Sequence, residues 1–310
     1  MQVSVPLANS ARTRQVSFGL GDIRILEALS RYHILSAQQV CRLLYKLGSL
    51  TFVQTKLKHF TDLALCQRLF LPRTTRAGSA PSLYTLARKG LNYLKNQGVD
   101  VDHRYRPSEK REHGYLFLSH TLAINDVLIA AELVARRVPE IRVETMLHER
   151  TLKREPIYIQ DGDIKVPVIP DGWLDFRIGG TRQMCLAIEV DCGTEEKRQW
   201  RRKVRSLLAW TNGTYQERFG TPSLTITVIA TPGRKRQMDL IRWTESELAA
   251  RGQENCADIF RFTSVSADTI EPEEFFLSPC WLRPFDRLPE ASGGPVFDSY
   301  RGTPLLTLSN

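Results

Sequence analysis

The chain has 310 residues, of which 42% are hydrophobic, and a formal net charge of +9. This length suits one large domain or two ordinary ones, and the hydrophobic share is enough for a buried core. The longest apolar runs fall well short of the roughly 18–20 residues of a membrane helix, and residues 1–10 lack the pattern of a secretory signal. Six cysteines without a CxxC pair indicate reduced thiols in a cytoplasmic protein, and argue against a zinc ribbon or a disulfide framework.

The basic residues are concentrated in the first third of the chain. Residues 1–112 hold 18 Lys and Arg against 7 Asp and Glu, whereas residues 113–283 hold 23 against 24. Such a surplus is typical of domains that bind a polyanion, although a solvated basic face would give the same count. The first third is therefore a candidate for binding nucleic acid.

Three short helices are expected in this third. The first covers residues 22–32, and the second begins after Ser36, which forms a capping box with Gln39. The third covers residues 50–63 and turns an apolar stripe inward. Its outward face carries the residues that we expect to contact DNA, namely Thr51, Gln54, Thr55 and Lys58.

Two strands, at residues 66–71 and 82–86, flank a long basic loop. Arg73 and Arg76 lie in this loop, where they can reach phosphates or the minor groove. A helix over residues 87–97 completes the pattern, which predicts a winged helix-turn-helix over residues 1–98. The alternative is a small helical domain that packs against a partner protein. Residues 99–113 are polar and charged, as in a linker.

The pattern of the remaining chain indicates a mixed sheet covered by helices. A long apolar helix at residues 116–137 precedes four strands, at residues 141–150, 165–168, 171–178 and 184–191. Helices at 194–210 and 235–251 alternate with strands at 224–230 and 258–263. This order predicts an α+β or α/β domain over residues 114–284, followed by a tail over residues 285–310.

Three carboxylates are expected to meet at one end of two of these strands. Alternation places Glu189 and Asp191 on the same face of their strand. The Gly179-Gly180 pair predicts a hairpin that brings Asp171 opposite them. Clustered carboxylates repel one another, and a divalent cation with oxygen ligands is the usual remedy. The alternative is a set of exposed strand-end acids paired with Arg or Lys.

A lysine on the following helix is placed to join this cluster. Trp200 and Val204 belong to the inner stripe of the helix, and Lys203 borders that stripe. We therefore expect Lys203 to reach the acids, with Lys197 as the reserve candidate.

From about residue 17 to residue 284 the chain resembles the replication-relaxation family of plasmids and mobile elements. The resemblance is carried by the winged-helix pattern, by Trp200 with Lys203, and by residues 119–126, 169–171, 188–195 and 276–284. The second domain in turn resembles the PD-(D/E)xK restriction-endonuclease-like fold. That resemblance implies that Asp171 and Glu189 hold Mg²⁺ or Mn²⁺.

The chain departs from this motif at one position, because Asp191 stands where a lysine is usual. Asp191 is then a further metal ligand or orients the attacking water, and Lys203 takes the place of the lysine. Asp126 on the long helix matches an acid that some members of the superfamily carry there. His120 is a candidate for proton transfer, with a capped or core histidine as the alternative.

Two functions remain open at this point. The first is a metal-dependent endonuclease or nickase that acts on double-stranded DNA during replication, relaxation or transfer of a mobile element. The second is a DNA-binding replication or mobilisation factor whose nuclease-like domain is silent. Both allow a relaxase or another replication protein as partner, or a homodimer, and neither needs a membrane. A transcriptional or RNA-directed regulator ranks last, because clustered aromatic platforms are not evident.

Overall fold

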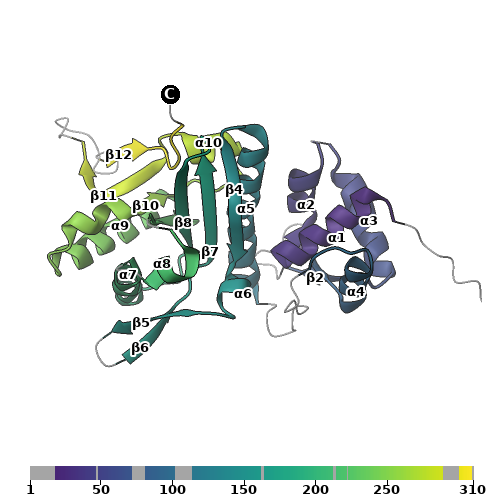
Figure 1. Cartoon of the computed structure of the whole chain (residues 1–310), viewed down its shortest axis with the longest axis horizontal. Coiled ribbons are helices and arrows are strands. Elements are labelled where there is room, and N and C mark those ends of the chain that lie inside the picture. The colour runs from purple at the N-terminus through teal and green to yellow at the C-terminus, as the bar shows by residue number, and fades with distance from the viewer. Residues whose placement is uncertain are drawn as a thin grey trace, which may run out of the picture.

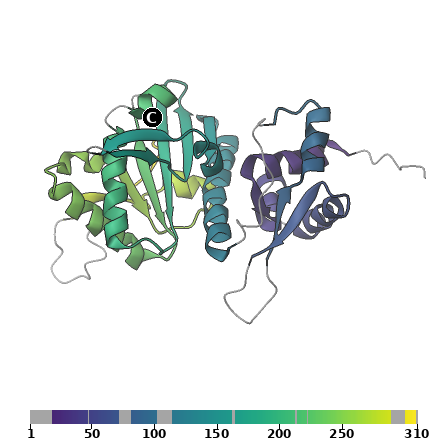
Figure 2. The ribbon, with the colours of Figure 1, turned by 90° about the horizontal axis from the view of Figure 1, so that it is seen from below.

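The structure is a computed structural model that describes residues 18–46, 48–71, 81–101, 114–161, 164–211, 214–221, 223–288 and 300–308. The elements before residue 101 form an N-terminal unit, and those after residue 114 form a sheet unit (Figure 1). The long helix α5 (Tyr115–Arg137) lies between the N-terminal unit and the large sheet, as both views show (Figures 1 and 2).

The N-terminal unit contains the expected helices and strands. These are α1 (Leu20–Tyr32), α2 (Ala37–Leu44), α3 (Leu50–Asp62), β2 (Cys66–Phe70), β3 (Ser82–Leu86) and α4 (Arg88–Asn96). The capping box at the start of α2 is confirmed, because the Gln39 amide donates to Ser36 Oγ and the Ser36 amide donates to Gln39 Oε1. A strand that we did not expect, β1 (Ile34–Ser36), pairs with β3 and completes a three-stranded antiparallel sheet. Three residues are too few to show alternation in a sequence.

Part of the expected N-terminal region lies outside the described residues. This holds for Arg73 and Arg76 in the loop, and for residues 102–113 of the linker.

A seven-stranded mixed sheet forms the centre of the sheet unit, in the order β12-β11-β10-β9-β8-β7-β4. Its strands are β4 (Ile141–His148), β7 (Gly172–Ile178), β8 (Arg182–Asp191), β9 (Thr225–Ala230), β10 (Phe260–Thr263), β11 (Trp281–Arg287) and β12 (Tyr300–Thr303). The pairs β8–β9 and β9–β10 are parallel, and the other neighbours are antiparallel. The predicted hairpin is confirmed, since Gly172 pairs with Ile188 and Ile178 with Arg182 across β7 and β8. Both turn glycines, Gly179 and Gly180, have the positive φ that such a tight turn requires.

Several elements differ from the expected ones. The strand expected to reach residue 150 ends at His148, where the short helix α6 (Glu149–Leu152) begins. A strand that was not expected, β5 (Ile157–Asp161), pairs with β6 (Ile164–Val168) in a separate two-stranded hairpin. The region expected as a tail contributes β12, and β11 crosses the boundary that we placed after residue 284.

Helices cover both faces of the large sheet. On one face, Leu186 and Ile188 of β8 join a core with α5 and α10 (Pro272–Leu277). On the other, Cys185 and Ala187 join a core with α7 (Lys197–Thr211) and α9 (Arg234–Ala249), next to α8 (Thr214–Phe219). The alternation expected for β8 is therefore confirmed. Among the described helices only α5 is long and apolar enough to pass for a membrane span, and 61% of its most apolar window is buried inside the protein.

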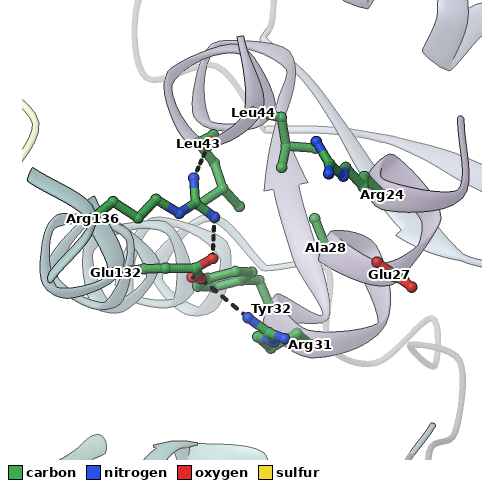
Figure 3. A pocket seen from close by; sticks show the side chains of 9 residues that line it. All are labelled: Arg24, Glu27, Ala28, Arg31, Tyr32, Leu43, Leu44, Glu132 and Arg136. Atoms are coloured by element: carbon green, nitrogen blue, oxygen red, sulfur yellow. Dashed lines mark hydrogen bonds and ion pairs between the residues drawn. The ribbon is translucent and has the colours of Figure 1, made fainter. Parts of the chain in front are cut away.

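Polar contacts fix the N-terminal unit to α5. Asn125 of α5 donates to the carbonyl oxygens of Tyr32 and Ile34, at 3.1 and 2.6 Å. Glu132 accepts a hydrogen bond of 2.6 Å from the Tyr32 hydroxyl and forms ion pairs with arginines of both units (Figure 3). Since Asn125 is fully buried, this junction is part of the folded core and not a loose tether.

Candidate functional site

Asp171 lies immediately before β7, at the end of the sheet where β8 finishes. Its backbone amide donates to Ile188 O, and its Oδ2 accepts a 2.8 Å hydrogen bond from the Val190 amide. His120 Nε2, from the first part of α5, lies 3.1 Å from the same oxygen. Burial alone would raise the pKa of Asp171, but the charges of Lys203 and His120 hold it below its usual value. Asp171 is therefore a buried carboxylate that keeps its charge.

Glu189 faces Lys203 across the gap between β8 and α7. The Lys203 Nζ lies 2.5 Å from Glu189 Oε2 and 3.1 Å from Glu195 Oε1. Only 1% of Glu189 is exposed, and burial raises its pKa against the opposing charge of Lys203. Burial would lower the pKa of Lys203, but the surrounding carboxylates, Glu189 first, raise it well above its usual value. The sequence-based expectation that Lys203 reaches the acids agrees with this geometry.

A further acid, Glu149, was missed in the sequence. One ligand atom from each of His120, Glu149 and Asp171 lies within 4.8 Å of the others, a spacing that can hold a metal ion. Glu149 is the first residue of α6, in a segment where we expected the strand to continue to residue 150. Its position in the site depends on the chain turning from strand into helix at this residue. Its place in the sequence carries no local signal, because β4 and β7 meet only through their long-range pairing.

The pKa of His120 follows from this environment. Burial would lower it, but the hydrogen bond to Asp171 and the Asp171 charge raise it to about 9. His120 therefore carries a proton near neutral pH. It could donate this proton to another group, or a cation that binds the imidazole could displace it.

Asp191 does not point to the other acids and forms a separate ion pair. Arg236 of α9 donates to both its oxygens, from Nε at 2.7 Å and from Nη2 at 2.8 Å. The amide of Gly193, a residue with φ of 82°, donates to Asp191 Oδ1 at 2.9 Å. Both carboxylate oxygens thus have strong partners, and the structure does not bring Asp191 to the metal position that the motif implied.

Asp126 is also separate from the acid cluster, since its partners belong to the N-terminal unit. Its Oδ1 accepts a 2.9 Å hydrogen bond from Gln39 Nε2 and lies 3.9 Å from Arg42 Nη1. Burial raises the pKa of Asp126 to about 7, although Gln39 opposes this shift and Asp268 adds to it. The acid that we expected in the site is therefore part of the junction between α5 and α2.

We predict that Asp126→Asn stabilises the protein, and more so at alkaline pH. A carboxyl whose pKa is raised on folding contributes fully below its unfolded value of about 3.8, and this contribution is lost as the pH rises through about 7. The gain in unfolding free energy should be larger at pH 8 than at pH 5 by on the order of 2 kcal/mol. Urea unfolding at the two pH values measures it. A variant that is less stable than the wild type at pH 8 would contradict this role.

The outer face of α3 is as the sequence predicted. The four residues expected to contact DNA are exposed, namely Thr51, Gln54, Thr55 and Lys58. The inward stripe of Val53, Leu57 and Phe60 is fully buried. Their exposure leaves them free to contact a ligand, and DNA binding stays a prediction.

Two cavities lie next to the residues described above. One, of about 450 Å³, lies between the β5–β6 hairpin and α7, and Glu189 and Lys203 line it. The other, of about 470 Å³, lies between α1, α2 and α5 (Figure 3). In the second cavity Glu132 is already paired with Arg31 and Arg136, so it belongs to the junction of the two units. The first cavity is therefore the one that adjoins the acid cluster.

Together, these features define a mixed α+β protein that carries buried acids, a lysine and a protonated histidine at one end of its sheet. The chain belongs to the replication-relaxation family, whose model matches residues 26–224. The matched range includes α2, α3 and all the residues of the acid cluster. Neither the curated proteins nor the solved structures contain a match to the chain.

Proposed function

We propose that this protein is a metal-dependent DNA endonuclease or nickase that acts in the replication or relaxation of a plasmid or mobile element. The observation that carries the proposal is the convergence of Asp171, Glu189 and Glu149 with a lysine and a histidine. Family membership supports the biological setting. Clusters of buried acids with shifted pKa values are found most often at functional sites, which supports this assignment.

The donor set fits a hard divalent cation. Carboxylate oxygens are the ligands that Mg²⁺ and Mn²⁺ prefer; Asp171 belongs to the group with His120 and Glu149, and its charge also acts on the nearby Glu189. Asp171 would hold the ion with Glu189 or Glu149, and His120 would add a nitrogen ligand after losing its proton. A bound cation would neutralise the phosphate oxygens and acidify a water molecule.

The residues of the chain supply the remaining chemistry. Lys203 keeps its charge in the buried site and would stabilise the negative charge that develops on the phosphate. His120, with a pKa of about 9, holds a proton that it would donate to the leaving oxygen when it is not a ligand. Lys203 would thus take the role of the lysine that Asp191 replaces in the PD-(D/E)xK pattern.

The N-terminal unit would select the DNA. Its first three helices and its three-stranded sheet have the order of a winged helix, and the exposed face of α3 would enter the major groove of double-stranded DNA. Because this unit is packed against α5, the DNA-binding face and the proposed cutting site would keep a fixed position relative to each other. A relaxase or another replication protein, or a second copy of the chain, would complete the assembly.

We expect purified protein to nick supercoiled plasmid in the presence of Mn²⁺ and to leave it intact in EDTA. Glu149→Gln should weaken Mn²⁺ binding, measured by calorimetry, by roughly 10–100-fold, because it removes one charged ligand and keeps the shape. Glu155→Gln, which alters an exposed acid just after α6, is the control and should bind Mn²⁺ as the wild type does. Absence of nicking together with absence of Mn²⁺ binding would overturn the proposal.

One observation favours a second function, that of a silent DNA-binding scaffold. Glu189 already has Lys203 as its partner, and Asp171 has His120, so each acid is compensated without a metal. A protein that is only a scaffold would bind DNA with the same affinity in the presence and in the absence of Mn²⁺. The nicking experiment separates the two, since a scaffold leaves the plasmid intact.

A further inference from the structure

The cavity beside the acid cluster has two chemically different sides. Its apolar wall comes from Val166 and Ile169, at the end of the β5–β6 hairpin, and from Leu207 of α7. Its polar side carries Arg202 and Lys203 on α7, together with Glu189, with which Lys203 is paired. Its volume of about 450 Å³ falls within the roughly 300–1,000 Å³ of clefts that enclose small ligands. An apolar wall facing cationic groups matches one nucleotide, which has an apolar base face and a charged phosphate.

The acids are buried beside side chains that solvent reaches. Glu189 is 1% exposed and Asp171 is 6% exposed, whereas the side chains of Lys203 and His120 are 28% and 25% exposed. A paired base stack does not fit into a cavity of about 450 Å³, whereas a single unpaired nucleotide does. Glu189 and Lys203 both line this cavity, so a nucleotide bound there would lie beside Glu189.

The outer face of the hairpin adds a surface for a second base. Tyr158 of β5 is 47% exposed, and Lys165 Nζ lies 5.4 Å from the centre of its ring. Tyr158 pairs directly with Pro167, one of the residues that line the cavity. An exposed ring with an adjacent cation is the arrangement with which proteins bind single strands, since bases stack on the ring and the cation attracts the backbone.

We propose that the acid cluster acts on an unpaired DNA strand that enters along the β5–β6 hairpin, with one base in the cavity and a neighbouring base on Tyr158. This inference rests on the proposed nuclease function and adds the substrate class. Duplex binding by the N-terminal unit and single-strand binding by the hairpin would together direct the protein to DNA that is partly melted. Partly melted DNA of this kind forms when the strands of a replication origin or a relaxation site separate.

The experiment compares three DNAs of the same sequence: a full duplex, a duplex with a mismatched bubble, and the single strand. Each carries 2-aminopurine, whose fluorescence falls when the base stacks on protein. Wild-type protein with Mn²⁺ should cut the bubble and the single strand at least tenfold faster than the duplex. Tyr158→Ala should weaken single-strand binding by about tenfold, while Tyr158→Phe, which keeps the ring, should bind normally.

A further variant tests the cavity itself. Ser206 lines the cavity from α7, so Ser206→Trp should fill it and abolish cutting of the bubble. Its affinity for the duplex should match that of the wild type. Equal cutting of duplex and bubble by the wild type, or normal cutting by Ser206→Trp, would overturn the inference but leave the nuclease function standing.

The binding measurements decide the inference even if no DNA is cut. Absence of cutting by the wild type would count against the nuclease function. Fluorescence quenching by single strands that Tyr158→Ala and Ser206→Trp both lose would still support the hairpin as a single-strand site. Equal affinity of wild type and both variants for single strands would reject it.

Discussion

Asp171→Asn should reduce Mn²⁺-dependent cutting by at least about a thousandfold while leaving the protein folded. The Asn side chain keeps an oxygen to accept from the Val190 amide, so the local backbone contact survives. What is lost is the charge that would hold a cation in the proposed site and that raises the pKa of His120. Glu189→Gln should have an effect of the same order. Cutting rates and circular dichroism of the variants check both parts of this expectation.

Glu195→Gln is the matched control for these variants. Glu195 also pairs with Lys203, at 3.1 Å, but its side chain is 30% exposed and it is not grouped with Asp171. Its substitution should change the cutting rate only severalfold. A second readout is the pKa of His120, which NMR should find near 9 in the wild type and lower in Asp171→Asn, since Glu149 alone then opposes the effects of burial and of the Lys203 charge. A fully active Asp171→Asn would remove Asp171 from the chemistry.

Local patterns were enough to predict most of the elements of this chain. Helices α1, α3, α5 and α7 have apolar stripes with helical spacing, and α2 adds a capping box. The alternation of β8 and the glycine turn before it fixed the register that places Asp171 opposite Glu189. Lys203 could be chosen because it borders the buried stripe of its helix. These signals are all contained within one or two neighbouring elements.

The sequence-based expectations differed where distant segments decide the outcome. Glu149 enters the site because β4 pairs with β7, and nothing within residues 141–150 reveals that partner. Alternation placed Asp191 on the correct face, yet Arg236, from α9, takes both its oxygens. Asp126 was assigned from the resemblance alone, and the packing of α2 on α5 gives it another partner. Side-chain direction is thus a local property, whereas the choice of partner is not.

The ion pair between Asp191 and Arg236 should be one of the most costly contacts to break. Asp191 is 4% exposed, and Arg236→Gln would leave its carboxylate buried without a countercharge. Removing one partner of a buried pair typically costs 3–5 kcal/mol, and we expect about this loss in the free energy of unfolding. The double variant Asp191→Asn with Arg236→Gln should recover part of it, because no buried charge then remains unpaired. Urea unfolding of the four proteins measures the cycle.

The same variants decide whether Asp191 is a metal ligand. Arg236 also donates to the backbone oxygen of Glu195, whose side chain pairs with Lys203. Arg236 thus connects the end of β8 to the turn that contains Glu195. If Asp191 only anchors α9 to the sheet, Arg236→Gln at a temperature where it stays folded should bind Mn²⁺ as tightly as the wild type. If Asp191 is instead a ligand that Arg236 blocks, freeing its carboxylate should tighten Mn²⁺ binding. We expect unchanged affinity, because among the described residues Asp191 is not part of the group of ligand atoms that includes Asp171, and the Gly193 amide still holds one of its oxygens.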